Sequence, residues 1–69
     1  MESIYKIIEI VGTSEKSWED AAKTALETAS KTIQDIRIAE VNKFDIKVRT
    51  DGSLVYRVKL DVSFKYKID

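Results

Sequence analysis

The chain of 69 residues contains no cysteine, no histidine and no proline, and only two glycines, Gly12 and Gly52. Without cysteine there is no disulfide, no thiolate metal ligand and no thiol nucleophile. Without histidine the chain lacks the usual acid–base group of neutral pH and the commonest ligand of transition metals. No serine-based catalytic set, phosphate-binding loop or metal-ligand spacing replaces them. We therefore expect a protein that is not an enzyme.

An excess of one charge and long hydrophobic runs are also missing. Twelve acidic and twelve basic residues cancel, so no basic surface predicts binding to nucleic acid. No apolar run approaches the length that spans a membrane, and residues 1–6 do not resemble a signal peptide. These absences favour a cytoplasmic protein that binds neither nucleic acid nor membranes.

The length predicts one small domain over residues 1–69. A chain of this size buries little surface and usually needs disulfides, a metal or oligomerisation to be stable. With the first two disfavoured, oligomerisation is the stabilising device left.

The one clean helical period runs from Ser17 to Ile33, and its apolar side chains form a single stripe. The stripe consists of Trp18, Ala21, Ala22, Ala25, Leu26, Ala29 and Ile33. Ser17 is a suitable N-cap, and Asp20 three residues later gives a capping-box-like pattern. Because the stripe is mostly alanine, this helix is expected to lie close to a flat surface, with Trp18 as a core anchor.

Three extended runs supply that surface. Residues 3–11 are apolar on both faces, which predicts a strand covered on both sides, with a neighbouring subunit on one of them. Gly12 and the residues up to Lys16 read as a connection into the helix. Residues 36–50 change phase twice, which predicts bulges near Ile38–Ala39 and near Asn42–Lys43, and places Ile38 on the face opposite Val41.

The last run, residues 54–68, alternates without interruption, and its even-numbered side chains are apolar. Residues 50–53 form a hairpin turn, and even-to-even pairing requires a loop of three or five residues. The elements combine into an α+β fold, a β-α-β-β protomer whose three-stranded antiparallel sheet has the order 1-3-2 and wraps one helix. The long strands must overhang this helix, and we expect them to overhang onto other subunits.

Scattered carboxylates, including Asp45, Asp51 and Asp61, are interpreted as solvated or surface-paired groups. The alternating face of Arg57, Lys59, Asp61, Ser63 and Lys65 is interpreted either as a solvated face or as the lining of an interior cavity or subunit contact.

Taken together, the motifs resemble those of the dodecin family over nearly the whole chain. The matching segments are Val-Gly-Thr-Ser at 11–14, Ser-Trp-Glu-Asp-Ala-Ala at 17–22, Ala25-Leu26, Ala29-Ser30-Lys31-Thr32, Ile36-Arg37, Glu40-Val41, and the run from Val55 to Phe64. The resemblance implies a β-α-β-β protomer, a hollow homododecamer of tetrahedral symmetry, and storage of flavins bound in pairs at subunit interfaces, without catalysis.

Two positions depart from the flavin-binding pattern of that family. In flavin-binding members a tryptophan follows the basic residue at the start of the second strand; here the basic residue is Arg37 and the next residue is Ile38. In those members a glutamine in the middle of the third strand binds the polar edge of the ring, and this chain has Arg57 there. Isoleucine cannot stack as an aromatic ring does, and arginine has donors but no acceptor. Arg37, Ile38 and Arg57 are therefore the candidate cofactor-binding residues, and weak binding of riboflavin or FMN is expected.

Three functions remain open. The first is storage of a small ligand, with flavin as the family ligand. The second is a calcium-binding shell, because some dodecin-like proteins that lack the tryptophan are associated with calcium; no calcium loop is recognisable, and the metal ligands cannot be named. The third is a structural or regulatory assembly that holds no ligand.

Overall fold

The computed structural model describes residues 3–66. In chain order its elements are strand β1 (Tyr5–Ser14), helix α1 (Trp18–Ala29), strand β2 (Ile36–Val48) and strand β3 (Leu54–Lys65). Both β1 and β2 pair antiparallel with β3, in the sheet order β1-β3-β2. The predicted α+β fold and strand order are therefore confirmed.

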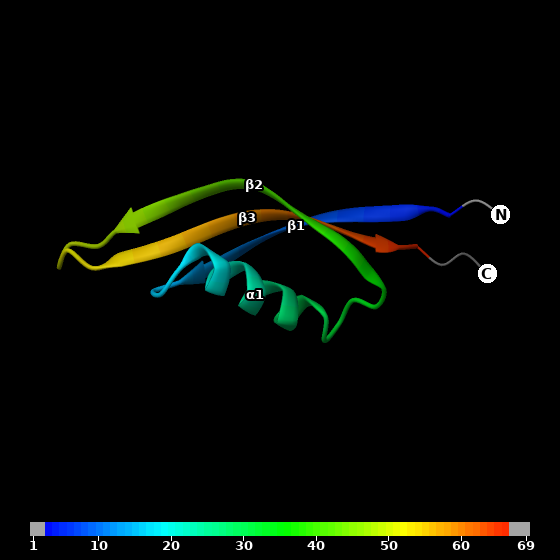
Figure 1. The fold of residues 1–69 in the computed structure, drawn as a ribbon, viewed down its shortest axis with the longest axis horizontal. Helices are drawn as coiled ribbons and strands as arrows, with labels where there is room; N and C mark the ends of the chain where they lie inside the picture. The colour runs from blue at the N-terminus through cyan, green and yellow to red at the C-terminus, as the bar shows by residue number, and fades with distance from the viewer. Residues whose placement is uncertain (1–2, 67–69) are drawn as a thin grey trace.

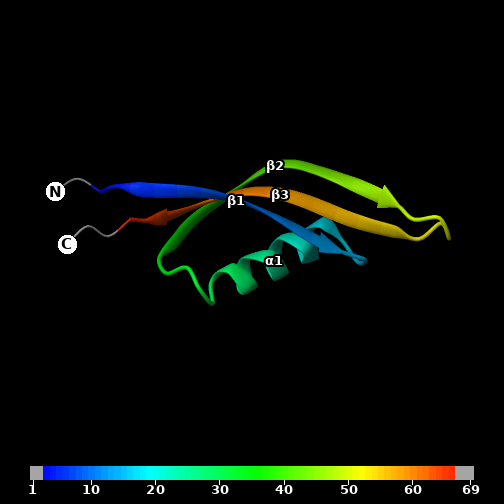
Figure 2. The same cartoon turned by 180° about the vertical axis from the view of Figure 1, so that it is seen from behind.

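The strands extend well beyond the helix, as the sequence predicts (Figure 1). The protomer measures 53 × 21 × 15 Å, whereas a helix of 12 residues is about 18 Å long. The β2–β3 hairpin projects past one end of α1, and the ends of β1 and β3 project past the other (Figures 1 and 2). Within residues 3–66 no helix has the length and apolarity needed to cross a bilayer.

Helix α1 begins as predicted but ends four residues early. The Ser17 hydroxyl accepts a hydrogen bond from the Asp20 amide at 3.0 Å, which caps the first turn. At the other end, the Ser30 hydroxyl donates to the Leu26 carbonyl at 2.7 Å, and the amides of the next two residues bond three residues back. Such side-chain bonds compete with the helical ladder, so the last predicted turn is not α-helical.

Strand β1 continues through Gly12 to Ser14, which corrects the prediction that the strand ends at Val11. Gly12 is a buried strand residue, paired with Val58 beneath the helix. A Cβ at this position would lie 2.8 Å from Ala25 Cβ and would also clash with the Ala21 carbonyl oxygen. The missing side chain therefore lets α1 approach the sheet closely.

The pairing of β2 with β3 has two register shifts, one between Ile36 and Ile38 and one between Val41 and Lys43. The second lies where the sequence predicts it, and the first is a residue or two earlier. Ile38 pairs with Ser63 and Val41 with Leu60, so these two side chains lie on opposite faces, as predicted.

Both strands end earlier than predicted, β2 at Val48 and β3 at Lys65, while Ile68 lies outside the described residues. Val48 pairs with Leu54 across a five-residue connection, which confirms even-to-even pairing. Gly52 has a φ of +88°, a conformation that glycine adopts without strain.

The core is small. Ala21 of α1 and Val58, Leu60 and Val62 of β3 are buried, with partly buried side chains of β1, of α1 and of the first residues of β2 packed around them. Helix α1 packs on β1 and β3, and β2 is the strand farthest from it over most of its length (Figures 1 and 2). The apolar row of β2 (Val41, Phe44, Ile46 and Val48) consequently stays exposed in the protomer.

Trp18 ties the start of α1 to β2. Its ring centroid lies 5.0 Å from that of Phe44 and 5.3 Å from that of Tyr56, and its Nε1 donates to the Asp45 carbonyl at 3.1 Å. The indole thus combines aromatic contacts with a satisfied N–H.

We expect Gly12→Ala to destabilise the protein by about 1–3 kcal/mol, because the added methyl overpacks a close helix–sheet contact. Chemical denaturation at fixed protein concentration measures the loss. The control is Thr13→Ala, an exposed neighbour that should change stability by no more than about 0.5 kcal/mol. Equal stability of the two variants would contradict the close approach of α1.

Trp18→Ala should cost about 3–5 kcal/mol per chain, since it removes a large aromatic anchor. Trp18→Phe keeps a ring but loses the N–H that donates to the Asp45 carbonyl. Loss of that hydrogen bond should lower the free energy of unfolding by about 1 kcal/mol relative to wild type. Denaturation under matched conditions compares both. A loss below about 1 kcal/mol for the alanine variant would show that the indole does not anchor β2.

Candidate ligand site

The sheet surface opposite α1, here called the far face, carries most of the charged side chains of the strands. Directly paired residues project to the same side of a sheet, so the register defines rows of neighbours across it. Along the strands the rows are Ile7–Ser63–Ile38, Glu9–Asp61–Glu40, Val11–Lys59–Lys43 and Thr13–Arg57–Asp45. The first of these rows has isoleucines on both sides of a serine, and it is followed by an acidic row, a basic row and a row that contains an ion pair.

The candidate residues Ile38 and Arg57 lie on this face but do not meet within one protomer. Ile38 is opposite Ser63, six residues along β3 from Arg57, which corresponds to about 20 Å. Ile38 is 66% exposed. Arg37 occupies the first register shift, with its Nη1 at 4.0 Å from the Asp35 carboxylate. A pocket that includes all three would need more than one subunit.

Arg57 is engaged by Asp45, one of the carboxylates that the sequence predicts to be solvated or surface-paired, and the surface pair is what the structure has. Its Nε donates to Asp45 Oδ1 and its Nη2 to Asp45 Oδ2, both at 2.7 Å. The hydrogen bond from Arg57 lowers the pKa of Asp45, and the carboxylate in turn raises the pKa of the guanidinium. This forked geometry is the strong form of the arginine–carboxylate pair. The second register shift places Asp45 opposite Arg57. The phase change near Asn42–Lys43 in the sequence was therefore the signal from which this ion pair could have been predicted.

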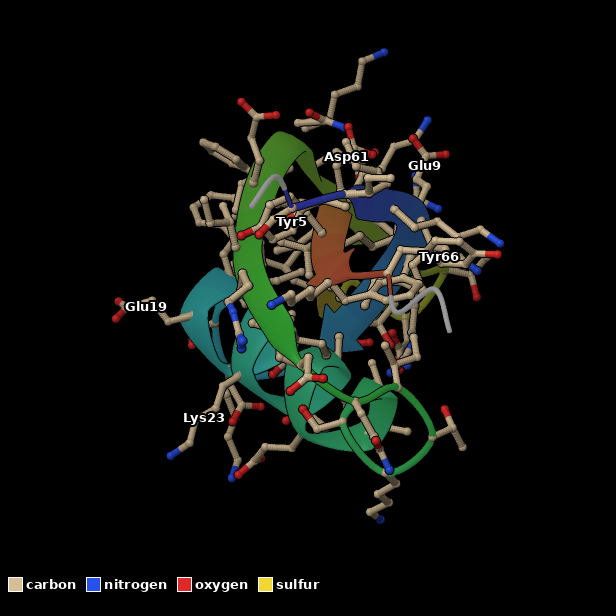
Figure 3. All side chains as sticks on the ribbon, turned by 90° about the vertical axis from the view of Figure 1, so that its right-hand side faces the viewer. Tyr5, Glu9, Glu19, Lys23, Asp61 and Tyr66 are labelled. Atoms are coloured by element: carbon tan, nitrogen blue, oxygen red, sulfur yellow. The ribbon has the colours of Figure 1, made fainter. Side chains whose placement is uncertain are left out.

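The acidic row joins three carboxylates from three strands. Asp61 lies between Glu9 on β1 and Glu40 on β2, and like charges placed directly opposite one another are unfavourable. One cation is close: Lys59 Nζ lies 3.5 Å from Glu9 Oε1. Figure 3 shows Glu9 and Asp61 on the same side of the sheet, away from Glu19 and Lys23 of α1. In the described part of the chain no three acidic side chains are close enough to hold a metal ion.

Two hollows flank β2. One lies on the far face, has a volume of about 360 Å³, and is lined by Glu9, Val11, Lys43, Asp45, Arg57 and Lys59. The other lies between α1 and β2, has a volume of about 260 Å³, and is lined by apolar side chains that include Trp18, Ala22, Val41 and Phe44. The first offers charged groups to a polar ligand, and the second offers an apolar surface.

Comparison with known proteins places these features in one family. The family model for dodecin matches residues 4–67. The calcium dodecin of Mycobacterium tuberculosis is 48% identical over 65 residues, which cover 94% of this chain and 92% of that protein. The dodecin of Thermus thermophilus is 37% identical over 65 residues, which cover 94% of each chain.

Solved structures agree with this assignment. The crystal structure of the M. tuberculosis calcium dodecin, described as having a novel calcium-binding site, superposes with a TM-score of 0.87 and covers 94% of this chain and 93% of that one. An arginine-to-alanine variant of the T. thermophilus dodecin superposes with a TM-score of 0.90 at 34% identity and covers 99% and 100% of the two chains. The protomer fold therefore matches that of both proteins.

Proposed function

The chain belongs to the dodecin family, and we propose that residues 1–69 act as one domain of a hollow homododecamer that stores or sequesters a small ligand without catalysing a reaction. Two features of the protomer support self-assembly. The apolar row of β2 is left uncovered by α1, with Phe44 61% exposed, and the strands overhang the helix at both ends. Copies of the chain that cover these surfaces would supply the apolar burial that the small core lacks.

The residues at the flavin positions do not fit an isoalloxazine ring. Ile38 offers no aromatic face, and the forked pair with Asp45 holds two donor nitrogens of Arg57. A ring bound there would have to compete with Asp45 for the guanidinium of Arg57. The N–H of the ring would also need a hydrogen-bond acceptor, and arginine has none. Arg37, Ile38 and Arg57 remain our proposed positions for a pocket shared between subunits, but flavin is not the ligand that this chain suits best.

Calcium is the ligand that we favour, and the acidic row carries that proposal. Glu9 and Glu40 flank Asp61 from both sides. In the described protomer the three carboxylates are too far apart to hold one ion, so calcium binding requires the longer glutamate side chains to turn toward Asp61. Carboxylate oxygens are the donors that Ca²⁺ prefers, and a cation would relieve the repulsion within the row. Ca²⁺ takes 6–8 oxygens, so three carboxylates would be completed by water or by other copies of the chain. The similarity to a calcium dodecin adds support from outside the chain.

Calcium should raise the melting temperature of the assembled protein, and Asp61→Asn should weaken calcium binding by at least about tenfold, because it removes the central charged donor. Calorimetric titration measures the affinity. The matched control is Glu19→Gln, an exposed acid on the outer side of α1, which should leave binding unchanged (Figure 3). Equal affinities for wild type and Asp61→Asn, or no calcium binding at all, would overturn the proposal.

Riboflavin and FMN should bind at least about a hundredfold more weakly than to a dodecin with tryptophan and glutamine at positions 38 and 57. Aromatic stacking contributes about 1–3 kcal/mol per ring and one hydrogen bond about 1 kcal/mol. The double variant Ile38→Trp with Arg57→Gln should restore binding, measured as quenching of flavin fluorescence.

The control for that experiment is Ile7→Trp with Arg57→Gln, which places the new indole in the same row but on β1. It should not restore quenching. Wild-type protein that quenches flavin at nanomolar concentration would show that the ring is held in another way. If neither flavin nor calcium binds, the remaining function is an assembly without a ligand.

A further inference from the structure

Two lysines on the far face lie directly opposite each other. Lys43 of β2 is the partner of Lys59 of β3, and such a pair of like charges is destabilising when nothing lies between them. We propose that Lys43 and Lys59 bind a small oxyanion of the phosphate class in the far-face hollow, at a site separate from the acidic row.

The register shift in β2 creates this juxtaposition. Val41 faces α1 opposite Leu60, and the extra residue Asn42 then turns Lys43 to the far face opposite Lys59. Bulges redirect side chains in this way and are common beside functional sites. An unbroken strand would have placed Lys43 on the same face as Val41, away from Lys59.

The other charges around the hollow leave one cation uncompensated. Both oxygens of Asp45 accept hydrogen bonds from Arg57, and Glu9 approaches Lys59 at 3.5 Å. Within residues 3–66 Lys43 makes no ion pair. The pKa of Asp45 is lowered mainly by the hydrogen bond and the charge of Arg57, and the charge of Lys43 adds the smallest contribution. Three cations therefore line the hollow against two carboxylates, and in the described part of the chain Lys43 is the cation that makes no ion pair.

The chemistry of the pair suits a tetrahedral oxyanion. Each ammonium has three donors and no acceptor, so two opposed lysines cannot satisfy one another but can share the oxygens of one anion. Val11, paired with Lys59, places an apolar side chain beside the two lysines at the edge of the hollow. The volume of about 360 Å³ is several times the roughly 30 Å³ that one water occupies in the liquid, so a phosphate group has room.

The experiment titrates inorganic phosphate into the assembled, calcium-free protein at constant ionic strength, with chloride as the reference anion. Lys43→Gln should weaken phosphate binding about tenfold, as expected when one charge-assisted contact at a partly exposed site is lost. The matched control is Lys47→Gln, which removes a lysine of the same strand and face that is paired with Val55 instead. Lys47 lies four residues along β2 from Lys43, about 13 Å away. Salt screens an exposed charge at this distance, so the variant should change the affinity for phosphate by less than about twofold.

Three further measurements make the result specific. Glu9→Gln frees Lys59 from its carboxylate and should tighten phosphate binding several-fold. In phosphate-free buffer, Lys43→Gln should raise the melting temperature because it removes the opposed charge. A titration with glycerol 3-phosphate then separates the two sources of the oxyanion: tighter binding of the ester indicates a phosphorylated metabolite, and equal binding indicates free phosphate.

The proposal is overturned if phosphate binds no more tightly than chloride, or if Lys43→Gln and Lys47→Gln weaken binding equally, which would indicate only the general field of the face. Because the titration contains no calcium, its outcome is independent of whether the acidic row binds that ion.

Discussion

The pairing of β2 with β3, interrupted by two register shifts, decides which side chains of β2 face α1 and which face away. A strand's side chains alternate, so each shift moves every following residue to the other face. The first shift sends Ile38 to the far face, and the second sends Lys43, Asp45 and Lys47 there while Phe44, Ile46 and Val48 return to the side of the helix. The ion pair of Arg57, the acidic row and the opposed lysines all depend on this register.

The helix side follows from steric contact and limited coverage. Gly12 allows α1 to lie close to β1 and β3, where Ala21 and three residues of β3 are buried. In that position α1 does not cover the apolar row of β2, which stays exposed. Trp18 connects the start of the helix to β2 through its hydrogen bond to the Asp45 carbonyl. A protomer with so small a core and so much exposed apolar surface is best stabilised by copies of itself.

On the far face, the charges differ in how well they are compensated. The forked Arg57–Asp45 pair is complete, and because the pKa of Asp45 is lowered from 3.8, the pair forms throughout the neutral range and is lost only as the pH falls through that lowered pKa. Within residues 3–66 the acidic row has a single cation in ion-pair contact, Lys59 at 3.5 Å from Glu9, and Lys43 of the two opposed lysines makes no ion pair. Bound ions would act on the uncompensated rows, because there a ligand removes repulsion as well as adding contacts.

Periodicity in the sequence was enough to determine the element order, the sheet order, the faces of β3, the existence of both irregularities of β2 and the position of the second, because alternation of apolar side chains directly reflects burial. It did not locate the end of α1, where the Ser30 hydroxyl competes for backbone carbonyls, or the strand role of Gly12, whose importance is a contact with a helix distant in sequence. Ile38 and Arg57 were identified by resemblance, but their separation of about 20 Å within one chain follows from the strand register. The partner of Arg57 and the opposition of Lys43 and Lys59 were decided only by the tertiary structure, because a one-residue difference in the position of a bulge changes which charges meet.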